Sequence, residues 1–263
     1  MHFAPETGVT TILDMALAGR AATLTPGTVH VWFVNLRDWH WADDDSLLDR
    51  QERERAARFV RVPDRRQFVR AHSALRRLLA AYLCTAATAF TYDVGAYGRP
   101  RVANQDALIN FNISHSGDWM VLALGLDCTV GIDIEAWRDS IGDEVLIERY
   151  FSANEAALWR MESLSRRPAA FAQLWTRKEA TLKALGCGLI NDLSAIDTVS
   201  ESTLRLSLAR LRRAEELPDG VAEGVPILYD LPTPDKHAAA LVCFGYATVT
   251  VCRWHGEIVQ PWP

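Results

Sequence analysis

The chain has 263 residues, of which 49% are hydrophobic and 23% are charged, and its formal net charge at pH 7 is −5. This length and composition suit a folded soluble protein made of one large domain or two small ones. No run of residues reaches the ~20 apolar positions that a bilayer-spanning helix needs, which argues against a membrane-embedded protein.

The N-terminal residues and the cysteines favour a cytoplasmic protein. Residues 1–20 lack the basic start and the apolar core of a secretion signal. The five cysteines are scattered and never form a C-x-x-C pair, so we expect neither a disulfide framework nor a zinc site. We expect all five to be small buried hydrophobic residues, namely Cys84, Cys128, Cys187, Cys243 and Cys252.

The first half of the chain is predicted to contain a leader, a strand, two helices and two strands, at 1–28, 29–36, 47–59, 65–83, 109–114 and 120–126. Apolar residues alternate in the first strand, as in a half-buried strand, and recur at helical spacing in the second helix. Pro63-Asp64 separates the two helices. Gly117-Asp118 is the expected hairpin turn between the last two strands.

The second half is predicted to contain a strand, three helices and three further strands, at 130–135, 144–150, 153–162, 169–185, 195–199, 203–208 and 239–250. Residues 210–235 carry charges, prolines and glycines, which predicts an irregular connection. Helices followed by paired strands thus occur twice. We therefore predict an α+β protein with an N-terminal half at 29–129 and a C-terminal half at 130–263.

Arginines are concentrated in one stretch of this acidic protein. Residues 50–77 hold ten Arg against only Glu52, Glu54 and Asp64. A basic stripe inside an acidic chain suggests a compact anionic ligand more than a long polyanion such as nucleic acid. The alternative is the solvated face of an amphipathic helix, which most Arg-rich stretches turn out to be.

The segment V-G-I-D-I-E at 130–135 carries two carboxylates on one face of a strand. Alternation places its three aliphatic residues on one face and Asp133 and Glu135 on the other. Two carboxylates beside buried aliphatic residues are costly unless a cation lies between them, and Mg²⁺ typically binds one or two carboxylates together with phosphate oxygens. The alternative is an edge strand whose polar face meets water.

A third carboxylate and a lysine come from the predicted helix at 169–185. Glu179 and Lys183 are four residues apart and share a helix face with Trp175. This helix also carries many large apolar residues, so it is expected to be well buried. The pair would complete a metal and phosphate site. The alternative is an ordinary surface ion pair without a functional role.

The segment F-N-I-S-H-S at 111–116 ends a strand in hydroxyl groups and an imidazole. Ser and His side chains at a strand end can donate hydrogen bonds to phosphate, although a lone His is more often a structural residue. His115 beside Ser114 or Ser116 would also suit a hydrolase. We disfavour that alternative because no serine lies in a G-x-S-x-G turn.

Together these motifs resemble the ordered signature of the Sfp-type 4′-phosphopantetheinyl transferases. The matching segments are G-R-P at 98–100, F-N-I-S-H-S at 111–116, V-G-I-D-I-E at 130–135, L-W-T-R-K-E-A-T-L-K at 174–183 and G-C-G-L at 186–189. The resemblance implies two similar α+β halves related by a pseudo-twofold axis, with the active site in the cleft between them. It further implies a monomer.

The resemblance also implies roles at the reacting centre. Asp133, Glu135 and Glu179 are similar to the family's magnesium ligands, and Glu179 also to a residue that helps to deprotonate the acceptor serine. Lys183 resembles the lysine that neutralises the transferred phosphate. His115 resembles a histidine that contacts coenzyme A phosphate, so Glu179, Lys183 and His115 are the implied catalytic residues.

The implied coenzyme A contacts are Arg55, Arg99, Pro100, Ser114, His115, Asp133 and Lys183. Arg55, four residues before Phe59, matches a basic position that holds the 3′-phosphate. A second basic position of the family falls at Glu52, so this chain departs from the pattern there. The leader has no counterpart in the family pattern either.

The implied reaction moves the 4′-phosphopantetheine group of coenzyme A to a serine of an acyl or peptidyl carrier protein, with Mg²⁺ as the cofactor. The implied partners are coenzyme A and the carrier, without nucleic acid or membrane. Two alternatives are a magnesium-dependent hydrolase of a nucleotide pyrophosphate and a non-catalytic carrier-binding relative. Carrier-dependent turnover distinguishes the first, and the intact carboxylate set argues against the second.

Overall fold

The computed structural model describes residues 24–37, 45–94, 100–103, 109–137, 144–187, 192–213, 217, 222, 224–245, 248–255 and 258–261. Most of the predicted leader, residues 98 and 99 of the G-R-P segment, and part of the segment at 186–189 therefore lie outside the described residues.

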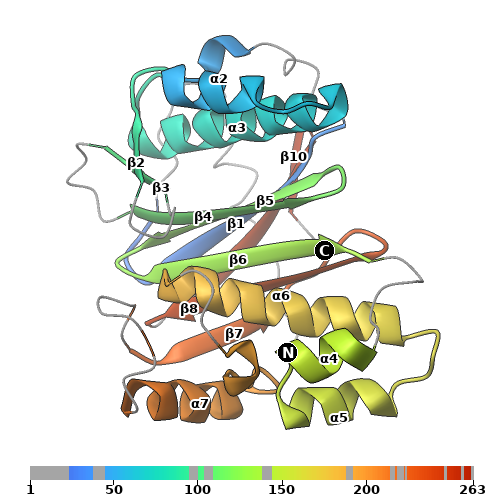
Figure 1. Cartoon of the computed structure of the whole chain (residues 1–263). Helices are drawn as coiled ribbons and strands as arrows, with labels where there is room; N and C mark the ends of the chain where they lie inside the picture. Colours follow the sequence, from blue (N-terminus) through green and yellow to red (C-terminus); the bar gives the residue numbers. More distant parts are fainter. Residues whose placement is uncertain are drawn as a thin grey trace.

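Two β-sheets stacked between helices form the described part of the molecule (Figure 1). The first sheet has the order β10 (Ile258–Pro261), β9 (Thr248–His255), β1 (Thr28–Asn35), β5 (Trp119–Leu126) and β4 (Ile109–Ser116). The second has the order β6 (Thr129–Ala136), β8 (His237–Phe244) and β7 (Pro226–Asp230). A short hairpin of β2 (Tyr92–Val94) and β3 (Pro100–Val102) stands apart.

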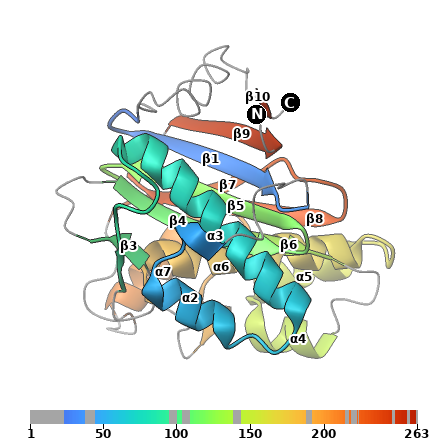
Figure 2. The same ribbon diagram turned by 90° about the horizontal axis from the view of Figure 1, so that it is seen from above.

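Helices cover the outer faces of both sheets. On the first sheet lie α2 (Arg50–Ala57) and α3 (Val62–Leu83), with α3 running across the strands (Figure 2). On the second lie α4 (Glu144–Tyr150), α5 (Ala153–Met161), α6 (Arg167–Leu185) and α7 (Glu201–Arg213). Short 3₁₀ turns occur at η1 (Asp45–Leu47) and η2 (Leu193–Ala195).

Local sequence signals explain where these helices begin and end. Asp49 and Ser152 each form a capping box with a glutamate three residues later, which satisfies the first free N–H groups of α2 and α5. A proline lies in the first turn of α3 and of α6, where no hydrogen-bonded N–H is needed. Gly186 ends α6 in the left-handed conformation with φ of 73°.

The hydrophobic core is layered because β1 is buried on both faces. Trp32 and Val34 pack against α3, whereas Val31 and Phe33 point into the space between the two sheets. Alternating aliphatic residues of β6 fill that space from the other side. The predicted half-buried strand at 29–36 is therefore a fully buried central strand, and the α+β class is confirmed.

Three predictions in the second half were wrong. Residues 195–199 form the end of η2 and an extended segment, and 203–208 belong to α7. The alternating leucines at 204, 206 and 208 imitate a strand, but Leu206 is 71% exposed while Leu204 and Leu208 share the buried face of a helix. The third prediction, a single strand at 239–250, is in fact split between β8 and β9, which lie in different sheets.

The predicted irregular connection at 210–235 is partly regular, since it contains the end of α7 and the whole of β7. Four cysteines are buried as expected, but Cys84 is exposed because it ends α3 in a left-handed conformation with φ of 52°. All five cysteines are free. The division at residue 129 and the pseudo-twofold relation stay predictions; β9 and β10 lie in the first sheet with β1.

Candidate active site at the seam between the sheets

The candidate site lies along a seam where the edge strands of the two sheets meet. β4 ends the first sheet and β6 ends the second. Side chains join these two strands: Asn112 accepts a hydrogen bond from the Ile132 N–H at 2.9 Å, and Ser114 donates to Asp133 at 2.7 Å. Ser116 donates to Glu135 at 3.0 Å. Every second residue of β4 therefore fixes a position on β6, which gives F-N-I-S-H-S a structural role.

Helix α6 packs closely on β6 at Gly131. A Cβ atom at this position would collide with the Ala180 carbonyl and with the backbone of Ala184, so only glycine permits this approach. This close packing brings Lys183 of α6 to β6, where its Nζ lies 2.6 Å from Asp133 Oδ1. The lysine also donates to Ser114 Oγ at 3.0 Å. Lys183 from the predicted helix and Asp133 from the predicted strand are therefore in contact.

The three predicted metal ligands face the same cleft and repel one another. Burial raises the pKa of Glu179, and the negative charge of Asp133 raises it further. Burial and then Asp133 likewise raise the pKa of Glu135. A nearby cation would stabilise the charged form of both carboxyl groups.

The same cleft also holds basic side chains. Arg55 lies over the ring of Phe68, with its guanidinium carbon 5.3 Å from the ring centre. His115 is exposed to the cleft, yet neighbouring protein atoms lower its pKa by desolvation, and the positive charges of His72, Lys183 and Arg55 lower it further. An anion bound among these groups would be attracted by all of them.

One cleft of about 650 Å³ collects the predicted site residues that the structure describes. Its lining includes Arg55, Pro100, Ser114, His115, Asp133, Glu135, Glu179 and Lys183, together with Trp175. Arg99 lies outside the described residues. The sequence analysis missed two lining residues, His72 and Asn112. The N-x-S-x-S spacing in β4 could have indicated the role of Asn112, whereas no local pattern indicates His72.

Glu52, the residue that departs from the family pattern, has a structural role. It is 5% exposed and caps α2. Arg76 donates to its Oε2 from Nε at 2.5 Å, and His72 lies 2.7 Å from its Oε1. The fully buried Arg76 guanidinium also lies over the rings of Phe90 and Tyr92, at 5.1 and 5.0 Å from their centres. A basic residue in place of Glu52 would put a second positive charge next to that of Arg76.

Comparisons with known proteins agree with this geometry. A model of the N-terminal part of 4′-phosphopantetheinyl transferases matches residues 32–126, and a model of the 4′-phosphopantetheinyl transferase superfamily matches residues 129–240. The 4′-phosphopantetheinyl transferase HetI of Nostoc sp. is 31% identical over 171 residues, which cover 64% of this chain and 72% of HetI. This chain belongs to the 4′-phosphopantetheinyl transferase superfamily.

Other 4′-phosphopantetheinyl transferases and related proteins align over similar lengths. The transferase psf-1 of Bacillus pumilus is 32% identical over 160 residues, which cover 59% of this chain and 67% of psf-1. A relative from Synechocystis sp. is 31% identical over 154 residues, which cover 57% of this chain and 62% of the relative. This chain therefore spans somewhat less than two thirds of that relative.

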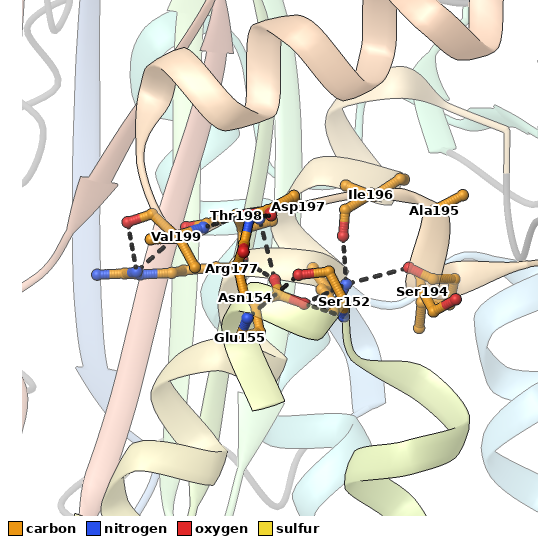
Figure 3. A network of polar contacts seen from close by, with 12 residues as sticks. Ser152, Asn154, Glu155, Arg177, Ser194, Ala195, Ile196, Asp197, Thr198 and Val199 are labelled. Atoms are coloured by element: carbon orange, nitrogen blue, oxygen red, sulfur yellow. Dashed lines mark hydrogen bonds and ion pairs between the residues drawn. The ribbon is translucent and has the colours of Figure 1, made fainter. Parts of the chain in front are cut away.

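In this member of the 4′-phosphopantetheinyl transferase superfamily, a buried polar network supports α6 behind the cleft (Figure 3). Lys178 and Glu155 form an ion pair at 2.7 Å, and both side chains are 0% exposed. Lys178 also donates to the carbonyls of Leu193 and Ile196, and Glu155 accepts from Thr198. The network joins α5, α6 and the segment after η2, so it fixes the helix that carries Glu179.

The donor atoms in the cleft of this superfamily member suit a divalent ion bound together with a ligand. Asp133 Oδ2 is buried and has no hydrogen-bond partner, which leaves one oxygen available to a cation. Among the described residues, no three His, Cys, Asp or Glu side chains form a ready-made cluster for a metal. Mg²⁺ commonly takes only one or two carboxylates and fills its other positions with phosphate oxygens and water, so the carboxylates present fit that ion.

No helix among the described residues is long and apolar enough to cross a bilayer.

Proposed function

We propose that this chain transfers the 4′-phosphopantetheine group of coenzyme A to the serine hydroxyl of an apo acyl or peptidyl carrier protein. The observation that carries the proposal is one cleft that holds three carboxylates together with the basic side chains of Arg55, His115 and Lys183, in a member of this family. Coenzyme A carries a pyrophosphate and a 3′-phosphate, and a cleft with this distribution of charge suits both.

The carboxylates Asp133, Glu135 and Glu179 are the proposed magnesium ligands. When bound, Mg²⁺ would supply positive charge next to the pyrophosphate and so stabilise the charge that develops there. The unpartnered Asp133 Oδ2 and the raised pKa values of the two glutamates support this assignment.

The chain's own side chains provide positioning and charge. Lys183, already held by Asp133 and Ser114, would contact the phosphate being transferred. His115 and Arg55 would bind other phosphate oxygens, with Arg99, Pro100 and Ser114 contacting the nucleotide part. Phosphoryl transfer needs mainly this kind of positioning and charge neutralisation.

Glu179 is the proposed general base. Its raised pKa brings the carboxylate closer to the range in which it accepts a proton effectively. The serine oxygen forms a bond to the β-phosphorus of coenzyme A, and the bond from that phosphorus to the bridging oxygen breaks. Adenosine 3′,5′-bisphosphate leaves with the electron pair, and the serine proton goes to Glu179 and then to solvent.

The proposed partner is a small acidic carrier domain, which would dock near the arginines around Arg55 partly by electrostatic attraction. We further propose a monomeric, cytoplasmic enzyme that acts without nucleic acid or membrane.

The test is mass spectrometry of several apo-carriers incubated with this protein and coenzyme A, with Mg²⁺ or with excess chelator. We expect one phosphopantetheine to be added only when the divalent ion is present. Full activity in chelator would refute the metal assignment. Hydrolysis of coenzyme A without modification of any carrier would favour the pyrophosphate hydrolase instead.

A further inference from the structure

His72 lines the cleft and is held in place from the protein interior. Its Nδ1 lies 2.7 Å from Glu52 Oε1, and its side chain is 22% exposed while that of Glu52 is 6% exposed. Within the described part of the chain, no hydrogen bond is made by the second ring nitrogen, Nε2. One nitrogen of the ring is therefore fixed by a buried carboxylate, and the other is available at the cleft.

The carboxylate that holds His72 is itself rigid. Glu52 receives the Nε–H of Arg76, whose side chain is 0% exposed. Its hydrogen bonds with His72 and with the Asp49 backbone lower the pKa of Glu52 despite its burial, so it carries a negative charge near neutral pH. Because a carboxylate oxygen can only accept a hydrogen bond, Nδ1 is the donor in this contact, and Nε2 is left for a ligand in the cleft.

Phe68 contacts both His72 and Arg55. The Phe68 ring stacks on the His72 ring with centres 4.0 Å apart, and the Arg55 guanidinium lies over the same ring at 5.3 Å. The positive charge of His72 also acts on His115 from β4. Three basic side chains from α2, α3 and β4 thus line the same cleft.

We propose that His72, oriented by Glu52, is a further coenzyme A-binding residue that contacts the 3′-phosphate together with Arg55. This inference rests on the proposed function, because it takes coenzyme A to be the ligand. The 3′-phosphate is a phosphomonoester that carries close to two negative charges at neutral pH. Arg55 and His72 are two basic side chains that line the same cleft, which suits this group.

The test measures binding, so it does not depend on transfer. Calorimetric titrations compare adenosine 3′,5′-bisphosphate with adenosine 5′-monophosphate, which lacks the 3′-phosphate, for the wild type and three variants of His72. Loss of one partly exposed charge-assisted contact is expected to weaken bisphosphate binding about tenfold in His72→Ala and His72→Gln. Monophosphate binding should stay unchanged, and His72→Arg should retain bisphosphate binding.

Two carboxylate variants test the role of Glu52. Glu52→Gln should weaken bisphosphate binding, but should add nothing to the loss in His72→Ala, because Glu52 acts through His72. Glu54→Gln is the matched control, since Glu54 lies on the same helix and makes only an exposed ion pair with Arg50. If Glu52→Gln does not fold, the His72 variants decide the question.

Two results would overturn the inference alone: wild-type affinity of both His72→Ala and His72→Gln for the bisphosphate, or an equal loss of affinity for both nucleotides. A wild-type protein that binds neither nucleotide would refute the proposed function as well. The two failures are therefore distinguishable.

Discussion

The buried ion pair of Lys178 and Glu155 allows the effect of one substitution on stability to be worked from the structure. Lys178→Met keeps an unbranched side chain that is one atom shorter, and removes the ion pair at 2.7 Å together with hydrogen bonds to two carbonyl groups. Glu155 would then lose its cationic partner at 0% exposure and keep hydrogen bonds from Thr198 and the Ser152 N–H only. Removal of one partner from a buried pair typically costs ~3–5 kcal/mol. We expect the free energy of unfolding to fall by about that amount.

Urea denaturation followed by linear extrapolation measures this change. The matched control is Arg205→Met, which breaks an exposed pair with Glu201 at 3.4 Å and should cost only ~0.3–0.5 kcal/mol. The double variant Lys178→Met with Glu155→Leu should be more stable than Lys178→Met alone, because it leaves no unpaired buried charge. A loss below about 1 kcal/mol in Lys178→Met, or a double variant that is less stable still, would refute this reasoning.

Three further outcomes are expected. Glu179→Gln keeps the shape of the side chain and removes a base, so kcat should fall by roughly 10²–10⁴ while the melting temperature is retained; near-normal turnover or a failure to fold would contradict the assignment. Gly131→Ala should cost ~1–3 kcal/mol of stability, because its Cβ collides with the backbone of α6, and an unchanged denaturation midpoint would count against the close packing. Burial lowers the pKa of His30 to about 4, below the unfolded value of about 6.5, so the folded state takes up this proton at lower pH than the unfolded state does. The stability that His30 contributes is present above about pH 6.5 and is lost as the pH falls toward 4, by up to about 3 kcal/mol. Denaturation at both pH values should show that the free energy of unfolding falls less in His30→Gln than in the wild type. Equal falls in the two proteins would exclude this cause.

The sequence contained enough information to predict which residues form the reacting part of the site. Alternation in β6 placed Asp133 and Glu135 on the face opposite the aliphatic core, and helical spacing in α6 placed Glu179 with Lys183. These are local patterns, and the structure brings both into one cleft. The pairing of Lys183 with Asp133 required the tertiary fold, since 50 residues separate them.

The parts that the sequence did not reveal depend on contacts between distant segments. His72 gains its position from Glu52, 20 residues earlier, and the local capping box that includes Glu52 gives no sign of this contact. In α7, alternation of apolar residues over 204–208 favoured a strand. Only the packing of Leu204 and Leu208 together against the second sheet shows that this segment is a helix. Tertiary packing overrode the local pattern there.

The parallel pairing of β1 with β9 has a consequence for how the chain folds during synthesis. Val29 lies opposite Val249, 220 residues further along, and β9 lies beside β1 in the first sheet (Figure 2). An N-terminal segment emerging from the ribosome can pair β1 with β5, but one side of β1 must wait for a strand that is made much later. An unpaired buried strand invites pairing with other chains. The nascent protein is therefore most prone to aggregate in the interval before residues 248–255 are translated, and a nascent chain arrested within that interval should depend on chaperones more than the completed one.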